Sequence, residues 1–306
     1  MYAINDLESK FRRDGEMAMK CAICPRRCGI DREIKRGYCG MGDMPVVAKA
    51  FLHVWEEPCI SGTKGSGTVF FSGCNLKCVF CQNYMISQQN SGNKVSINDL
   101  KNIYLDLQHK GAHNINLVNP SHFVMQIRES LSHILGLKIP VVYNTNAYES
   151  LEGLKLMEGI VSVYLPDLKY FSMEASRKFS CAEDYFQVAT EAIIEMYRQV
   201  GGALINEEGI MQKGLIIRHL ILPGNIRDSI MILDWIKANM PQDIYVSLMS
   251  QYTPYYKAED YPEINRRITR REYDKVVNHF LKLGFENGYI QERESADESF
   301  IPDFSN

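Results

Sequence analysis

From residue 67 onward, short apolar runs alternate with segments whose apolar residues recur at helical spacing. The runs are rich in Val, Ile and Tyr and too short for helices, so they predict strands at Thr68–Phe71, Ile115–Val118, Pro140–Tyr143, Val161–Leu165, Leu215–Leu222 and Ile244–Leu248. The segments between them predict helices that begin at the candidate caps Ser96 and Ser121 and others near residues 149–158, 173–179, 184–200, 226–239 and 270–283. Strands alternating with helices predict an α/β fold with a parallel sheet.

The segments that follow these strands favour a partial barrel over an open doubly wound sheet. Each strand runs into a polar or Gly/Pro-containing cluster: FSGC, VNPSH, NTNAY, LPDLK, LPGN and SQYTP. In a barrel of parallel strands all such ends meet at one rim, whereas a doubly wound sheet brings together only those near its switch point. We therefore expect a partial, TIM-like (β/α)6 barrel.

The N-terminal part of the chain lacks this periodicity. It contains four clustered cysteines and many charges, which predict a small cysteine-rich lobe where a metal group takes the place of a large core. We divide the chain into this N-terminal lobe at residues 1–66, the barrel at 67–290 and an acidic C-terminal tail at 291–306.

Composition bears on the compartment and on the partners. The 306 residues carry a formal net charge of −3, which gives no overall case for nucleic-acid binding. The N-terminus lacks the apolar stretch of a secretory signal, and no apolar run reaches the roughly 18 residues of a membrane span. Nine cysteines in such a chain indicate free thiols in a reducing compartment, so we expect a cytoplasmic protein without a membrane segment.

The most informative cysteines are Cys74, Cys78 and Cys81, which form C-x3-C-x2-C directly after a predicted strand. Three thiolates at this spacing can hold three irons of a cubane cluster and leave the fourth iron open. A zinc site completed by a distant residue is the alternative, although zinc sites usually begin with a C-x2-C pair. Cys59 and Cys181 stand alone, and we expect both to be buried as small apolar residues.

The cysteine loop and its flanks resemble the radical S-adenosylmethionine (SAM) superfamily. The resemblance rests on the cysteine spacing with the aromatic Phe80 before the last cysteine, and on the stretches EEPCISGTKGSGTVFFSGCNLKCVFCQNYMIS, VYNTNAYES, VYLPDLKYF, IIRHLILPGN and LMSQYTPYY. It covers roughly residues 20–290 and points to an uncharacterised branch similar to the pyruvate formate-lyase activating enzyme.

This resemblance implies a [4Fe–4S] cluster on Cys74, Cys78 and Cys81, with the amino and carboxylate groups of SAM on the open iron. One-electron reduction would then release methionine and a 5′-deoxyadenosyl radical, which takes a hydrogen atom from a substrate. The cofactors supply this chemistry, and the protein positions and shields them.

The resemblance also gives candidate cofactor-binding roles to residues at the strand ends. Phe80 could stack on the nucleoside base, and Met249 could touch adenine or substrate. Asn119 stands where the superfamily usually has a Gly-Gly-Glu-Pro-like turn, whose glycines and glutamate are absent here. Asn144, Thr145 and Asn146 resemble a strand end that lies near the ribose and the carboxylate in the related activating enzymes. Asp167 and Lys169 match a charge pair beside the cofactor there, and Arg218 matches a basic residue near the methionyl carboxylate.

A second cysteine group, C-x2-C-x3-C-x10-C, consists of Cys21, Cys24, Cys28 and Cys39. Four thiolates can close a site completely, and the spacing leaves structural zinc and an auxiliary iron–sulfur cluster both open. Residues 10–36 hold nine Lys/Arg and four Asp/Glu, a local net charge of nine minus four, or +5. This charge fits an acidic electron donor such as flavodoxin or ferredoxin. Few aromatic residues accompany it, which disfavours nucleic acid as the partner.

Three functions remain open on this basis. We favour a radical SAM enzyme that acts on a small molecule or peptide, with a glycyl-radical-enzyme activase as the alternative and a non-catalytic metal-binding adaptor as a third. No catalytic residue is assigned, because none of the seven histidines forms a helical ligand pair. Glu56 and Glu57 could face the rim as substrate or proton-handling groups, or lie on a solvated turn.

Overall fold

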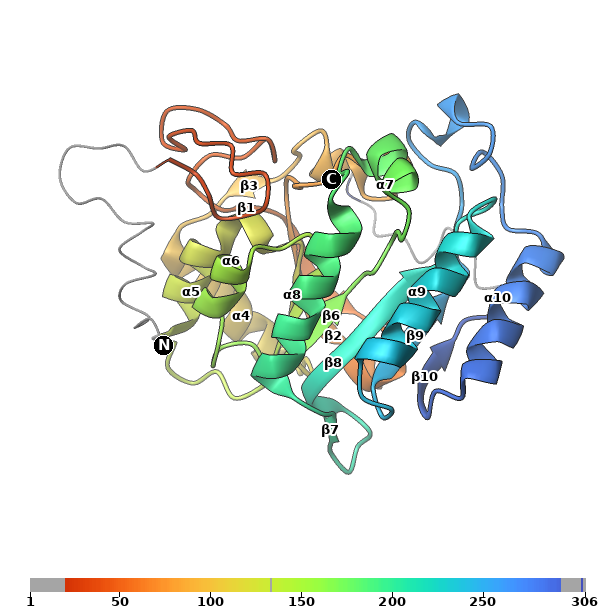
Figure 1. The fold of residues 1–306 in the computed structure, drawn as a ribbon. Helices are drawn as coiled ribbons and strands as arrows, with labels where there is room; N and C mark the ends of the chain where they lie inside the picture. Colours follow the sequence, from red (N-terminus) through yellow and green to blue (C-terminus); the bar gives the residue numbers. More distant parts are fainter. Residues whose placement is uncertain (1–19, 133, 293–303, 305–306) are drawn as a thin grey trace.

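The computed structural model describes residues 20–132, 134–292 and 304. One sheet runs through this part of the chain, with its strands hydrogen-bonded in the order β10-β9-β8-β6-β5-β4-β2-β1-β3 and with β7 paired to β8 (Figure 1). The strands are β1 Val46–His53, β2 Ser66–Phe71, β3 Asn93–Lys94, β4 Ile115–Val118, β5 Val141–Thr145, β6 Val163–Pro166, β7 Leu204–Ile205, β8 Met211–Leu220, β9 Tyr245–Met249 and β10 Asn287–Ile290.

The sheet is a partial barrel, as predicted. Strands β2, β4, β5, β6, β8, β9 and β10 are parallel to their neighbours, whereas β1 pairs antiparallel with both β2 and β3. The two ends of the strand order, β3 and β10, do not pair with each other among the described residues. The six predicted strands correspond to β2, β4, β5, β6, β8 and β9, and the sheet also includes β1 and β10.

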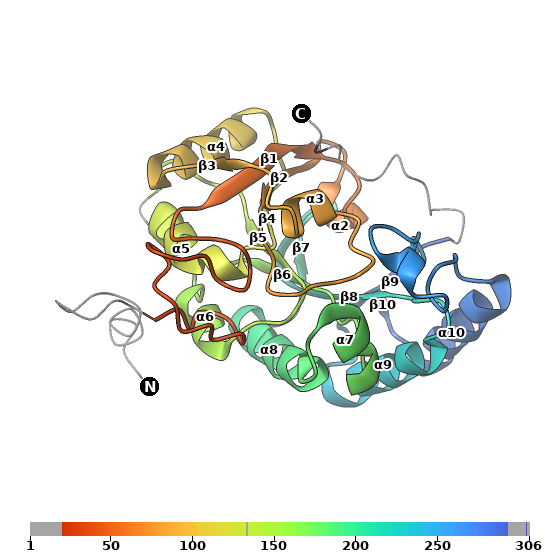
Figure 2. The same cartoon turned by 90° about the horizontal axis from the view of Figure 1, so that it is seen from above.

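Helices cover the outer side of this curved sheet, where α4, α5, α6, α8, α9 and α10 follow one another in an arc (Figure 2). The helices of the described residues are α2 Pro58–Ser61, α3 Tyr84–Ser87, α4 Ile97–His109, α5 Val124–Ser132, α6 Leu151–Leu156, α7 Met173–Ser180, α8 Tyr185–Val200, α9 Ile226–Asn239 and α10 Arg270–Leu283. None of these is long and apolar enough to cross a lipid bilayer.

One of the two predicted helix caps is confirmed. Ser96 begins α4 and forms a capping box with Asp99, which satisfies backbone donors that the first helical turn leaves free. The prediction for Ser121 is wrong, because this residue starts a short 3-10 turn and its hydroxyl group donates to the buried Glu149. Helix α5 therefore begins three residues later, at Val124.

The chain enters the interior of the barrel between β1 and β2. Cys59 and Ile60 of the short helix α2 are buried there against Val142 and other apolar side chains of β5, β6 and β8. Burial of Cys59 was expected and is confirmed. The same expectation for Cys181 is wrong, because it is exposed at the C-terminus of α7, where its backbone is left-handed with φ of 54°.

Residues 20–45 form loops that lie over α5 and α6, beside β1 and β3 (Figure 1). The Ser150 hydroxyl group donates to the carbonyl of Ile23 at 2.7 Å, and Arg27 pairs with Glu152 at 3.5 Å. Strand β1 belongs to the first 66 residues and pairs with β2, so the sheet continues across the expected boundary of the N-terminal lobe. The division into a lobe and a barrel stays a prediction. The expected C-terminal tail lies mostly outside the described residues.

Candidate functional site

The cysteine loop leaves β2 through Gly73, whose φ of 84° favours glycine. A Cβ atom built here would lie 2.5 Å from Cγ of Met41 and 2.7 Å from the carbonyl oxygen of Cys39, so a side chain has no room. Further along, the loop is held by the end of α7, since the amide of Val79 donates to the carbonyl of Phe179 at 2.9 Å. The loop is therefore fixed between the N-terminal residues and α7.

The three sulfur atoms of this loop are supported by polar groups. Their partners are Asn146 Nδ2 at 3.4 Å for Cys74, Ser180 Oγ at 3.0 Å for Cys78 and Ser87 Oγ at 3.2 Å for Cys81. Hydrogen bonds to cysteine sulfur favour the thiolate form and tune the potential of an iron–sulfur cluster.

The thiols of the cysteine loop have raised pKa values, so they ionise only beside a positive charge. Burial, followed by the charge of Cys78, raises the pKa of the Cys74 thiol to about 12 and that of Cys81 to about 11, and burial also raises the pKa of Cys78. Thiolates can form here only with a bound positive group, which iron provides. No three His, Cys, Asp or Glu side chains in the described ranges lie close enough to bind one metal ion together. The donor set of three cysteine thiols fits an iron–sulfur cluster, which cysteine binds as thiolate.

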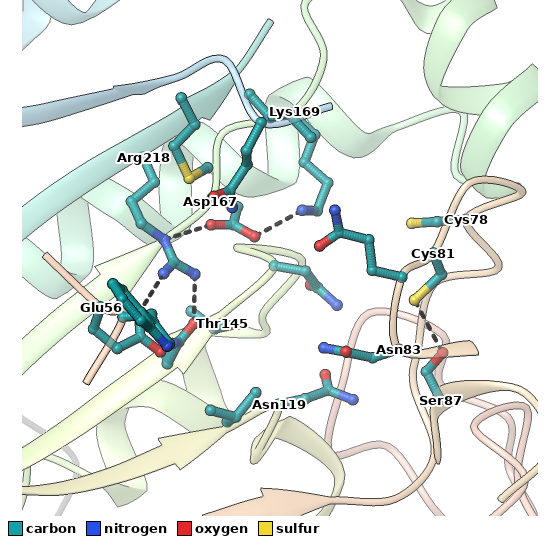
Figure 3. A pocket seen from close by; sticks show the side chains of 18 of the residues that line it. Glu56, Cys78, Cys81, Asn83, Ser87, Asn119, Thr145, Asp167, Lys169 and Arg218 are labelled. Atoms are coloured by element: carbon teal, nitrogen blue, oxygen red, sulfur yellow. Dashed lines mark hydrogen bonds and ion pairs between the residues drawn. The ribbon is translucent and has the colours of Figure 1, made fainter. Parts of the chain in front are cut away.

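All the candidate residues of the cysteine loop and the strand ends line one cavity of about 370 Å³. This cavity brings together Cys74, Cys78, Cys81, Phe80, Asn119, Asn144, Thr145, Asn146, Asp167, Lys169, Arg218 and Met249. Figure 3 shows Cys78 and Cys81 on one side of the cavity and Arg218 with Glu56 on the other. The site therefore has a sulfur end and a charged end. The N-terminal group of Cys21, Cys24, Cys28 and Cys39 lies outside it.

Arg218 is the centre of the charged end. Its Nε donates to Asp167 at 2.7 Å, its Nη1 to Glu56 at 2.9 Å and its Nη2 to Asn144 Oδ1 at 2.6 Å. Lys169 donates to Asp167 at 2.7 Å. Burial alone would raise the pKa of Asp167, but the charges of Arg218 and Lys169 outweigh it and hold that pKa below its usual value. Both cations are thus committed to protein partners.

This commitment bears on the expected role of Arg218. The resemblance implies that it lies near the methionyl carboxylate of SAM, and this role stays a prediction. In the structure its guanidinium group instead joins β8 to the segment between β1 and β2, which carries Glu56. Arg218 therefore at least fixes the shape of the cavity wall.

Glu56 and Glu57 both line the cavity, so the reading of these residues as a solvated turn is wrong. Asn116 and Asn144 donate to Glu56 Oε1 at 3.1 and 3.2 Å. Glu57 is only 8% exposed, and within the described part of the chain its Oε2 has no hydrogen-bond partner. Burial raises the pKa of Glu57, despite the opposing charge of Arg218.

The other strand-end residues hold the cavity wall in place. Asn119 has a left-handed backbone with φ of 57°, and its side-chain amide donates to the carbonyl of Gly73, which pins the start of the cysteine loop. Phe80 packs edge-on against Tyr252, with ring centroids 5.6 Å apart. Thr145 donates to Glu149, a buried carboxyl group that sequence reasoning missed.

Other functional neighbours were also missed. Ser87 and Ser180 contact the sulfurs of Cys81 and Cys78. Ser87 closes the stretch that carries the cysteine loop, whereas Ser180 lies 102 positions from Cys78, and no local pattern marks either side chain as a sulfur partner. Glu149 has a pKa of about 7, raised by burial and opposed by the hydroxyl groups of Ser121 and Thr145. Its only sequence signal is its position at the start of the helix predicted near residues 149–158.

Comparison with known proteins places this geometry in a family. Residues 68–203 match the Radical SAM superfamily. The chain is 34% identical over 282 residues to the Uncharacterized protein MJ0674 of Methanocaldococcus jannaschii. The aligned region covers 89% of this chain and 78% of that relative.

Solved structures with a similar chain path include SuiB of Streptococcus suis bound to S-adenosylmethionine, with a TM-score of 0.49 and 15% identity over 74% of this chain and 50% of that chain. HydG, a maturase of the [FeFe]-hydrogenase, has a TM-score of 0.48 and 13% identity, over 74% of this chain and 50% of the HydG chain. Methylornithine synthase PylB has a TM-score of 0.45 and 14% identity, over 97% of this chain and 84% of the PylB chain. The chain spans about half the length of the SuiB and HydG chains. By its matched region and its relative, this chain belongs to the radical SAM superfamily, and it is an enzyme of that class.

Proposed function

We propose that Cys74, Cys78 and Cys81 hold the [4Fe–4S] cluster of a radical SAM enzyme that takes a hydrogen atom from a small molecule or a peptide. The observation that carries the proposal is the joint position of the three sulfurs, each with a polar partner, on one side of a cavity of about 370 Å³. When bound, the cluster and SAM supply a 5′-deoxyadenosyl radical.

The residues of the chain prepare this cavity for the cofactors. Asn146 and Asn119 fix the cysteine loop through its sulfur and carbonyl groups. Phe80 offers an aromatic wall beside the loop, in a position suited to a nucleoside base. Asp167, held ionised by its two cations, fixes the side chains of Arg218 and Lys169 in the cavity wall.

The size of the cavity favours a small reacting group. Ligand sites commonly enclose about 300–1,000 Å³, and SAM must occupy part of this one. What remains accommodates a small molecule or one side chain of a peptide. The charged end, with Glu56, Glu57 and Arg218, is the part that would face such a group.

A glycyl-radical-enzyme activase is the second candidate. It is favoured by the strand ends Asn144–Thr145–Asn146 and Asp167–Leu168–Lys169, which resemble those of the pyruvate formate-lyase activating enzyme, and most of these residues line the cavity. If this function holds, deuterium from the glycine of a partner enzyme appears in 5′-deoxyadenosine. Deuterium transfer from a small substrate or peptide instead supports the first candidate.

Radical SAM enzymes need a one-electron reductant. We propose an acidic flavodoxin or ferredoxin in the cytoplasm, because the exposed Lys35 and Arg36 belong to the basic N-terminal region. Part of that region, residues 10–19, lies outside the described residues.

The test is anaerobic reconstitution of the wild-type chain and of a variant with Cys74→Ala, Cys78→Ala and Cys81→Ala. The wild type should turn SAM into 5′-deoxyadenosine after reduction, and the triple variant should not. Cys181→Ala is the matched control, because this exposed cysteine lies outside the cavity and its loss should change nothing. SAM cleavage by the triple variant at the wild-type rate would refute the enzyme proposal. Cluster binding without SAM cleavage in the wild type would favour the adaptor.

A further inference from the structure

The four N-terminal cysteines gather in one place. The amide of Cys21 donates to the carbonyl of Ile30 at 2.8 Å and the amide of Gly29 to the carbonyl of Cys21 at 2.9 Å, which folds the loop back on itself. The amide of Arg27 donates to the carbonyl of Cys24 at 3.0 Å, which closes a second turn in the same loop. Cys21, Cys24 and Cys28 therefore share one compact loop.

The backbone of Gly37 lies beside two of these sulfurs. A Cβ atom built on Gly37 would be 3.4 Å from Sγ of Cys28 and 3.5 Å from Sγ of Cys39. The Gly37 amide donates to the carbonyl of Met41 at 3.0 Å, so this backbone is held beside both sulfurs. Any group bound by the cysteines can therefore approach the backbone at Gly37.

A cation with an unused donor lies beside the same group. The guanidinium group of Arg32 donates to the carbonyls of His122 and Gly42, while its Nε is buried and has no hydrogen-bond partner in the described ranges. The contact with Gly42 ties this guanidinium group to the backbone three residues beyond Cys39. A buried and unpartnered N–H group points to a missing anionic acceptor, such as metal-bound sulfur.

The position of the group separates the two possible occupants. Zinc has no redox chemistry, whereas an iron–sulfur cluster carries electrons. The N-terminal group lies beside the cysteine loop of the cavity, because the amide of Cys74 donates to the carbonyl of Cys39. We propose that Cys21, Cys24, Cys28 and Cys39 hold a second [4Fe–4S] cluster instead of zinc.

This second cluster would lie next to the cysteine loop that holds the first. The amide of Cys74 donates to the carbonyl of Cys39 at 3.3 Å, so a short covalent path interrupted by one hydrogen bond joins a ligand of each site. Nearby, Arg26 Nε donates to the carbonyl of Asn75 at 2.7 Å. The N-terminal cluster accepts one electron from a reduced flavodoxin or ferredoxin and gives it to the cluster of the cavity. This relay rests on the proposed function, whereas the metal assignment does not.

The variant that lacks Cys74, Cys78 and Cys81 provides the direct test. After anaerobic reconstitution it should keep about four iron and four sulfide per chain, with a Mössbauer spectrum of a cubane cluster. One zinc without iron, or no metal, would overturn the inference. Because this variant cannot cleave SAM by the proposed route, its iron content is independent of that function.

Two further variants guard against misfolding. In the same background, Gly37→Ala should lower the iron content, because its methyl group would contact the sulfurs of Cys28 and Cys39 and compete with a bound cluster for the space beside them. Gly202→Ala should not, since a Cβ atom there meets nothing nearer than Asp243 at 3.7 Å. Equal iron in both would contradict the proposed position of the cluster.

The relay has its own readout in a chain with Cys24→Ala and Cys39→Ala, which keeps the cavity cysteines. We expect the electron paramagnetic resonance signal of the reduced cavity cluster to develop more slowly with reduced flavodoxin, and at an unchanged rate with dithionite. If the signal develops at the wild-type rate with both reductants, the relay is refuted. The assignment of a cluster to the N-terminal cysteines is then decided by the iron content alone.

Discussion

The Arg218→Met substitution tests whether the buried charge network holds the barrel together. Arg218 is 13% exposed and is bound to Asp167 and Glu56, which are 17% and 10% exposed. Met keeps much of the side-chain length and removes the charge. The matched control is Arg198→Met, because Arg198 also pairs with two carboxylates, Glu158 and Glu195, but is 51% exposed.

The magnitudes follow from burial. Removing one partner of a buried ion pair leaves charges that water cannot reach, so we expect Arg218→Met to lower the free energy of unfolding by about 3–5 kcal/mol. Exposed pairs contribute about 0–1 kcal/mol, and Arg198→Met should stay within that range. Lys169 remains beside Asp167 in the variant, which places the loss toward the lower end of the range.

The pH dependence has a definite sign. In the wild type the lowered pKa of Asp167 gives stability above its unfolded value of about 3.9, and this stability is lost as the pH falls through the folded value. Without Arg218, only Lys169 still opposes the effect of burial, so the pKa of Asp167 rises and its carboxylate takes up a proton more readily. The deficit of Arg218→Met should therefore shrink as the pH falls from 7 to 5.

Urea unfolding of the apoproteins, followed by circular dichroism at both pH values, measures these differences. Equal losses for the two arginine variants would refute the argument from burial. A deficit that stays the same at both pH values would refute the role assigned to the carboxylates.

Other substitutions test single contacts. Thr269→Ala removes the capping box of α10 and should cost about 1 kcal/mol in urea unfolding. Burial lowers the pKa of His219 to about 4, so this residue should contribute about 2 kcal/mol to the stability that the wild type loses between pH 7 and pH 5, and His219→Gln should reduce the loss by that amount. Gly288→Ala would place a Cβ atom 2.0 Å from the carbonyl of Val246, so it should separate β10 from β9 and speed hydrogen exchange of β10 amides.

Sequence patterns predicted the helices and strands that are determined by their own residues, and they missed those that depend on pairing with distant residues. The helix over residues 270–283 was recognised from its apolar spacing, and it is α10. The strand Asn287–Ile290 was missed because a four-residue segment with a central glycine carries almost no strand signal, and its pairing with β9 gives it its structure. Strand β1 was missed for a similar reason, since its residues alternate weakly and lie among the charges of the N-terminal region.

The candidate site shows the same division. The strand ends could be placed at one rim because parallel strands share a direction, and the cavity contains every residue expected there. The contact between Ser180 and Cys78 joins residues 102 positions apart, and only the packing of α7 against the cysteine loop creates it. The spacing of residues in the sequence cannot predict such a contact, because the contact depends on how α7 packs against the cysteine loop in the folded protein.

The ion pair between Glu56 and Arg218 has a consequence for synthesis of the protein. The two residues are 162 positions apart, so the ribosome completes Glu56 long before it reaches β8. Until Arg218 emerges, the nascent barrel has no guanidinium group to neutralise Glu56 and Asp167, and their burial would be costly. These carboxylates must remain hydrated on the growing chain, and the interior of the barrel can close only after β8 has been made.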